Sequence, residues 1–242
     1  MVMIVPLLLC YIPALVFFFW YTTFKRDKEY KNACRDLLIK GVLSCLGVVL
    51  FSFVANVLWA MIGIGKTHPI LDKAFHAFVL AAVSEELVKY LTTKGYIKKH
   101  NLKVSWIDLM VFTAIVGIGF HLIESVVYLF ESSAGQMIVR GFTAMHMTNG
   151  LIIGYYFGKA ITKNKPFYKV LALLIPIIVH GFYDFTLAEV VTAWCEYLVV
   201  GPILSLLIDF IYLFVLIVFI IKSRKNDINT SPLYGTDSGS AE

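Results

Sequence analysis

The sequence has few charged residues, and it lacks the cysteine spacings that build disulfide frameworks or zinc knuckles. Only 15% of its 242 residues are charged, whereas 59% are hydrophobic. This composition indicates a polytopic membrane protein. None of the four cysteines forms a Cys-x-x-Cys pair, and they lie at scattered apolar or loop positions. We therefore expect neither structural disulfides nor a zinc knuckle.

We expect neither a cleavable signal peptide nor internal repeats. The first apolar run, residues 1–24, carries no charge and is followed at once by Lys25, Arg26 and Lys28. A signal peptide has its positive charge before the apolar run and a small-residue cleavage site after it. The reversed order predicts a retained first span with the N-terminus outside.

Apolar segments predict an all-α bundle of about seven transmembrane helices. They are expected near residues 1–24, 37–62, 71–93, 106–130, 137–161, 167–188 and 197–221. We expect a single transmembrane domain, residues 1–225, with a catalytic core near 71–190. The polar stretch 226–242 is expected to be a disordered cytoplasmic tail.

The basic residues support this layout. Of the 21 lysines and arginines, 17 fall in alternate loops or flanks of the apolar segments. Because the basic residues cluster there, the formal charge of +5 does not indicate nucleic-acid binding. Basic loops face the cytoplasm, so an odd number of spans places the N-terminus outside and the C-terminus inside.

Charges within the third span are the main functional signal. Glu85, Glu86 and Lys89 interrupt an apolar helix, where each ionisable group costs roughly 2.5–3.5 kcal/mol at mid-membrane. Lys89 lies four residues after Glu85 and three after Glu86, so it can reach either carboxylate. It can pair fully with only one, and the other carboxylate remains available as a proton acceptor. A purely structural ion pair is the alternative.

The next three spans also carry polar pairs at helical spacing. The pairs are His121 with Glu124, His146 with Asn149, and His180 with Asp184. A single histidine in a span is more often a hydrogen-bonding partner than a catalyst. Four consecutive spans with such groups predict a water-filled polar chamber within the bilayer. The glycines at 117 and 119 should let a neighbouring helix approach closely. Asp209, in the last span, is expected to be structural or peripheral.

The chemistry favours activation of water by a carboxylate. The sequence has no Gly-x-Ser-x-Gly elbow and no His-Glu-x-x-His pair, and no cysteine is placed beside a histidine, so a covalent nucleophile is unsupported. A carboxylate base with assisting histidines would hydrolyse a bond within the membrane. A zinc ion held by Glu85, Glu124, His146 and His180 is the alternative, although a metal-free mechanism is preferred.

These motifs resemble the PrsW family of intramembrane proteases, within the wider group of CAAX prenyl proteases and bacteriocin-processing enzymes. The resemblance rests on Glu85-Glu86-x-x-Lys89, Phe120-x-x-x-Glu124, His146, and His180-x-x-x-Asp184, which occur in the family's order over about half of the chain. It implies a glutamate pair that activates water and histidines that assist. It also implies a membrane-bound anti-sigma factor as substrate, cut at site 1 in regulated intramembrane proteolysis. Relatives with prenyl-protein substrates carry His in place of Glu124, which argues against that substrate class.

The expected catalytic residues are Glu85, Glu86, Glu124, His146 and His180, and the expected supporting residues are Lys89, Asn149 and Asp184. Glu85 is expected to be the base, Glu86 a positioning group, and Lys89 a structural support; His121 is assigned no role. The expected partners are a membrane-anchored protein and the lipid bilayer, at the cell membrane. Helix lengths place all four motifs in the outer half of the bilayer.

Three alternatives remain open. A proton- or cation-coupled transporter also places carboxylates, histidines and lysines at mid-membrane, but the chain shows no pair of Pro- or Gly-broken spans repeated between two halves. A CAAX-type processing protease is the second alternative, and a scaffold whose polar residues only join helices is the third.

Overall fold

The computed structural model describes residues 4–23, 28–128 and 144–187, and part of 207–221. The described residues form helices, with no β-strand among them. The helices are α1 (Ile4–Thr23), α2 (Lys28–Ile62), η1 (Ile64–Lys66), α3 (Pro69–Phe75), η2 (His76–Val83), α4 (Ser84–His100), α5 (Trp106–Tyr128), α7 (Met145–Lys163) and α8 (Phe167–Leu187). The expected all-α class is confirmed.

Four of the described helices, α1, α2, α5 and α8, are long and apolar enough to cross a membrane. The structure therefore confirms a membrane-type helical protein without fixing seven spans or their orientation. The expected segments 1–24, 37–62, 106–130 and 167–188 correspond to these helices. Most of the seventh segment, together with Asp209 and the tail 226–242, lies outside the described residues.

The expected third span is one helical run of three parts, α3, η2 and α4, and it ends later than expected, at His100. Its middle part, η2, is a π-helix that ends directly before Ser84 and the glutamate pair. A π-helical turn leaves some carbonyls without their usual α-helical partner, and such turns occur often at functional sites. Here the carbonyl of Leu80 accepts hydrogen bonds from the hydroxyls of Ser84 at 2.5 Å and Ser52 at 2.9 Å.

Helix α5 is the centre of the bundle. It packs most extensively against α7 and α2, and its residues from Ile107 to His121 are almost all buried. Glycines explain the close packing. A Cβ on Gly117 would collide with the carbonyl of His146 in α7, and one on Gly119 would collide with the carbonyl of Leu38 and lie 3.0 Å from the Cα of Gly41 in α2. The expected close approach at both glycines is confirmed.

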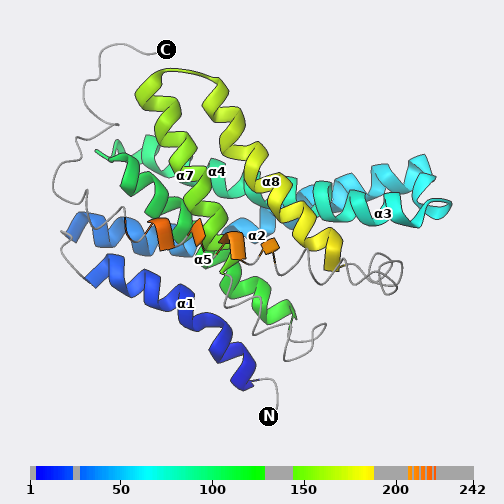
Figure 1. The fold of residues 1–242 in the computed structure, drawn as a ribbon, viewed down its shortest axis with the longest axis horizontal. Helices are drawn as coiled ribbons and strands as arrows, with labels where there is room; N and C mark the ends of the chain where they lie inside the picture. Colours follow the sequence, from blue (N-terminus) through cyan, green and yellow to red (C-terminus); the bar gives the residue numbers. More distant parts are fainter. Residues whose placement is uncertain are drawn as a thin grey trace.

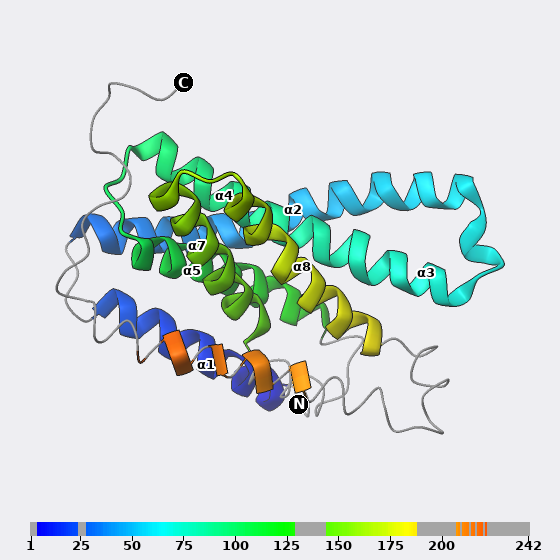
Figure 2. The ribbon, with the colours of Figure 1, turned by 45° about the horizontal axis from the view of Figure 1, so that its top comes forward.

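The end of α2 and helix α3 form a hairpin that extends away from the bundle in both views (Figures 1 and 2). Gly63, with a φ of 77°, turns the chain between them. The Trp59 and Phe75 rings stack at 4.3 Å, and the Trp59 indole N–H donates to Asp72 at 2.7 Å. Large apolar side chains, such as Leu46 and Met61, are exposed along α2, as a surface in contact with lipid requires.

Candidate active site

Helices α4, α5, α7 and α8 bring all eight expected site residues into one cluster. Helix α4 supplies Glu85, Glu86 and Lys89, α5 supplies Glu124, α7 supplies His146 and Asn149, and α8 supplies His180 and Asp184. Because α4 is a regular α-helix, Lys89 lies one turn beyond both Glu85 and Glu86 and can contact either carboxylate.

Glu86 is the most heavily bonded carboxylate of the cluster. Its Oε1 accepts hydrogen bonds from Lys89 Nζ at 2.9 Å, Asn149 Nδ2 at 3.0 Å and His180 Nδ1 at 2.7 Å. Glu86 and Lys89 are both fully buried. Three donors on one oxygen hold Glu86 in place and join α4 to α7 and α8. Glu86 is therefore poorly suited to accept a further proton.

Glu85 is buried in a different setting. Its Oε2 lies 3.7 Å from Lys89 Nζ, 3.5 Å from His146 Nδ1 and 3.9 Å from His180 Nε2, all in the range of ion pairs. Within the described part of the chain this oxygen has no hydrogen-bond donor. Lysine thus pairs closely with Glu86 and only loosely with Glu85. The unequal pairing leaves Glu85 as the less tightly held of the two carboxylates.

The two histidines are oriented by partners on both ring nitrogens. Lys89 can only donate, so its contact with His146 Nδ1 at 2.9 Å places the imidazole proton on Nε2. That nitrogen donates to Glu124 Oε2 at 2.5 Å. His180 faces carboxylates on both sides, with Nε2 3.1 Å from Asp184 Oδ2 and Nδ1 on Glu86. Two carboxylate partners suit the doubly protonated ring. The expected orientation of His180 by Asp184 is confirmed.

Among the described residues, the side chains of the cluster bond directly to one another, and the expected water-filled chamber stays a prediction. A cavity of about 10 Å³ borders Glu124 and His146, which is room for about one water molecule.

The donor set can hold a metal ion. Ligand atoms of Glu85, Glu86 and His146 lie within 4.8 Å of one another, and so do those of His121, Glu124 and His146. The Oε2 atoms of both Glu85 and Glu86 are buried without a hydrogen-bond partner in the described residues. Carboxylate oxygens and imidazole nitrogens are common zinc ligands. These residues therefore fit a divalent cation, although Lys89 already contacts the first group.

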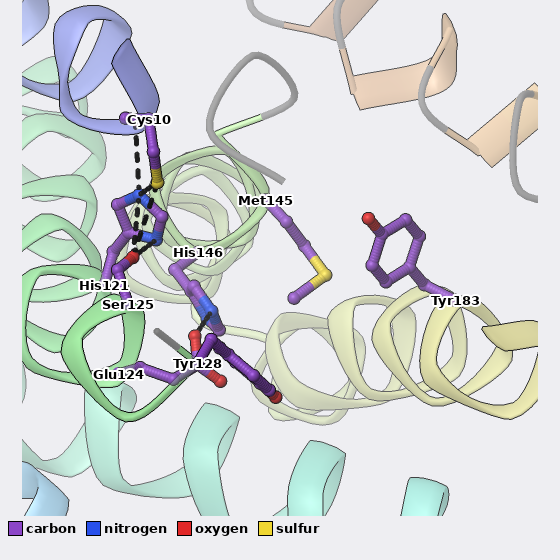
Figure 3. Close-up of a pocket in the computed structure, with 8 residues that line it drawn as sticks. All are labelled: Cys10, His121, Glu124, Ser125, Tyr128, Met145, His146 and Tyr183. Carbon is purple, nitrogen blue, oxygen red and sulfur yellow. Dashed lines mark hydrogen bonds and ion pairs between the residues drawn. The ribbon is translucent and has the colours of Figure 1, made fainter. Parts of the chain in front are cut away.

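Sequence reasoning missed a second polar group beside the cluster. Cys10 Sγ lies 3.3 Å from His121 Nε2 and 3.5 Å from Ser125 Oγ (Figure 3). The expectation that no cysteine is placed beside a histidine is therefore wrong. Cys10 precedes His121 by 111 residues, and only the packing of α1 against α5 brings them together. No local motif in the sequence signals this contact.

Comparison with known proteins identifies a family and several relatives. Residues 34–221 match the family model described as PrsW family intramembrane metalloprotease. Three relatives are each named Protease PrsW. The chain is 31% identical to the protein of Geobacillus kaustophilus (strain HTA426) over 122 residues, which is 49% of this chain and 54% of the relative. It is 28% identical to that of Clostridioides difficile (strain 630) over 191 residues, covering 74% and 78%. It is 29% identical to that of Bacillus subtilis (strain 168) over 129 residues, covering 51% and 59%.

The matched part of the chain spans about half the length of several of these relatives, including 54% of the Geobacillus kaustophilus protein. No solved structure matches the chain. The family description includes a metal, which favours the metal alternative over the preferred metal-free mechanism. The family model covers well over half of the sequence, including all four motifs. The chain therefore belongs to the PrsW family of intramembrane metalloproteases.

Proposed function

We propose that this protein is an intramembrane endopeptidase that hydrolyses a peptide bond of a membrane-anchored protein, with Glu85 as the base that activates water. One observation supports this assignment above the others. Glu86 Oε1 accepts three hydrogen bonds, whereas Oε2 of Glu85, next to it in the same buried cluster, lies 3.5 Å or more from Lys89, His146 and His180. A loosely held, desolvated carboxylate beside oriented histidines is suited to general-base catalysis.

The proposed reaction uses each residue in a defined way. Glu85 takes a proton from water, and the resulting hydroxide attacks the peptide carbonyl carbon. The positive charge of the protonated His180 ring, whose Nε2 lies 3.9 Å from Glu85 Oε2, stabilises the developing oxyanion through space, because both of its N–H groups already face carboxylates. Glu85 then returns the proton to the leaving amine as the C–N bond breaks. Lys89, Asn149 and Asp184 keep these groups in position.

Glu124 and His146 complete the arrangement. The pair faces the cluster from α5 and α7, and His146 links Glu124 to Lys89 through its two ring nitrogens. If the family's metal is bound, Glu85, Glu86 and His146 would hold it. A divalent ion supplies a Lewis acid that polarises the carbonyl group or the water molecule.

The topology and substrate are also proposals. The alternate basic loops support seven spans in the cell membrane, with the N-terminus outside and the C-terminus in the cytoplasm. On that layout the four motifs lie in the outer half of the bilayer, and the substrate is cut near its outer membrane boundary. The resemblance to the PrsW family supports an anti-sigma factor as the substrate and a role at site 1 of regulated intramembrane proteolysis.

Reconstituted protein tests the activity directly. Purified chain in proteoliposomes should cleave a membrane-anchored anti-sigma factor into two fragments, and mass spectrometry should place the new termini near the outer boundary. Proton and cation flux should stay at the level of empty vesicles. Flux without cleavage would indicate a transporter. The absence of both flux and cleavage would indicate a scaffold.

A further inference from the structure

A groove of about 610 Å³ lies between α5, α7, α8 and the described part of residues 207–221. Its lining side chains are apolar or aromatic, and they include Met110, Leu151, Ile175 and Phe214. No residue of the proposed reaction lines this groove. The cleavage mechanism therefore leaves it without a role.

One end of the groove is aromatic and carries a fixed positive charge. Tyr155 and Tyr156 line the groove, and Lys159 Nζ lies 4.4 Å from the ring centroid of the first and 5.9 Å from that of the second. The Tyr168 ring of α8 lies 5.8 Å from the same nitrogen. Aromatic faces attract an ammonium group, and its N–H groups can still donate to an anion. Lys159 is thus held where the groove could meet an anionic group.

Positive charge continues from this lysine into the connection between α7 and α8. Residues 159–169 contain four lysines, at 159, 163, 165 and 169, and neither aspartate nor glutamate. Trp106, which also lines the groove, packs against the same end of α7, since a Cβ on Gly158 would lie 3.0 Å from the Trp106 Cβ. Tryptophan and tyrosine are enriched at the level of lipid headgroups, and clustered lysines there attract anionic ones.

The dimensions of the groove suit a lipid chain better than a protein helix. Leu151 precedes Lys159 by eight residues, which is roughly 12 Å along α7. One leaflet contributes roughly 15 Å to a hydrocarbon core of about 30 Å, so a chain whose headgroup lies at Lys159 would reach Leu151. A helix about 10 Å wide and 12 Å long fills roughly 900 Å³, which is more than the groove offers.

We propose that this groove binds an acyl chain of an anionic phospholipid, whose phosphate is held by Lys159 and the other lysines between α7 and α8. The chain packs against α5, α7 and α8 together. The groove extends along α8 as far as Val179, directly before His180. A bound lipid therefore stabilises the packing of the two helices that carry His146 and His180.

Lipid binding to the delipidated, full-length chain in detergent tests the proposal. Dioleoyl phosphatidylglycerol and dioleoyl phosphatidylcholine have the same chains but differ in net headgroup charge, whereas glycerol phosphate has the charge without chains. We expect native mass spectrometry to show one retained phosphatidylglycerol per protein, preferred at least about fivefold over phosphatidylcholine. Phosphatidylglycerol should also raise the Tm, and glycerol phosphate should not.

Three substitutions separate the headgroup from the chain. Lys159→Gln should weaken phosphatidylglycerol binding about fivefold, whereas Lys159→Arg should bind it as wild type does. Lys31→Gln is the matched control, because it removes an exposed charge in the first turn of α2, outside the groove, and should have no effect. Ile152→Trp fills the groove and should weaken the binding of both lipids. Thermal unfolding without lipid shows that each variant is folded.

Equal affinity for the two lipids would overturn the proposal, and so would equal phosphatidylglycerol binding by Lys159→Gln and Lys31→Gln. Unchanged binding by a folded Ile152→Trp protein would place the chain elsewhere. Displacement of the lipid by a transmembrane peptide of leucine and alanine would assign the groove to a protein helix. All these measurements are made without a protease substrate, so they stand or fall independently of the proposed cleavage activity.

Discussion

His180 Nδ1 lies 2.7 Å from Glu86 Oε1, although the two residues are 94 positions apart in the sequence. This contact joins α8 to α4 at the centre of the buried cluster. The contacts also distinguish the two adjacent glutamates, since Glu86 Oε1 accepts three hydrogen bonds, whereas the contacts of Glu85 Oε2 are 3.5 Å or longer.

Glu86→Gln should destabilise the protein more than Glu85→Gln. The first change removes the negative charge that faces Lys89 and His180, and breaking a buried ion pair costs about 3–5 kcal/mol. The second removes a carboxylate whose Oε2 lies 3.5 Å or more from Lys89, His146 and His180, so its pairing is looser. Thermal unfolding in detergent should show a clearly larger fall in Tm for Glu86→Gln. Equal shifts would mean that the two carboxylates are structurally equivalent.

Lys89 should act as a support and not as a nucleophile. Its Nζ contacts Glu86 and His146, each at 2.9 Å, within a fully buried setting. Lys89→Met leaves the carboxylates uncompensated and should lower stability by about 3–5 kcal/mol, with loss of cleavage. Lys89→Arg keeps the charge and should retain part of the activity. Full activity in Lys89→Met would contradict the supporting role.

Close packing of α5 and α7 should depend on Gly154. A Cβ at this position would lie 2.6 Å from the backbone nitrogen of Met110, with no flexible side chain to yield. Gly154→Ala should therefore cost about 1–3 kcal/mol. Gly95→Ala is the matched control, because a Cβ there meets nothing within 4 Å and alanine favours the helix. Similar thermal stability of the two variants would show that α5 and α7 can separate at little cost.

Much of the site was predictable because it depends on local helical spacing. The regular α4 helix places Lys89 against both glutamates, and His180 and Asp184 pair across one turn, as periodicity indicates. Glycines 117 and 119 likewise signalled close packing. These features need only the geometry of one helix and the cost of burying charge.

Other features depend on tertiary packing and could not be predicted. Lys89 pairs more closely with Glu86 than with Glu85. This difference depends on Asn149 and His180, which donate hydrogen bonds to Glu86 from two other helices. The π-helical turn before Ser84 has no clear sequence signature. The contact between Cys10 and His121 arises only because α1 packs on α5.

Thiol labelling tests the proposed orientation. With the native cysteines replaced, Glu124→Cys and Asp184→Cys should react with an impermeant thiol reagent added outside, because both side chains are partly exposed, at 17% and 18%. Lys98→Cys, in the basic end of α4, should react only after the membrane is permeabilised, which lets the reagent reach the cytoplasmic side. The reverse pattern would invert the topology and the proposed cleavage side.

The rate of cleavage by Glu85→Gln is the most direct test of the central claim. Single-turnover cleavage of a membrane-anchored substrate should be compared for wild type, Glu85→Gln and the control Glu29→Gln, whose carboxylate is exposed in the first turn of α2. General-base catalysis contributes about 10²–10⁴-fold, so Glu85→Gln should lose that much rate while its Tm stays close to that of wild type. Glu29→Gln should cleave at the wild-type rate. Near-wild-type cleavage by a folded Glu85→Gln protein would contradict the assignment of Glu85 as the base.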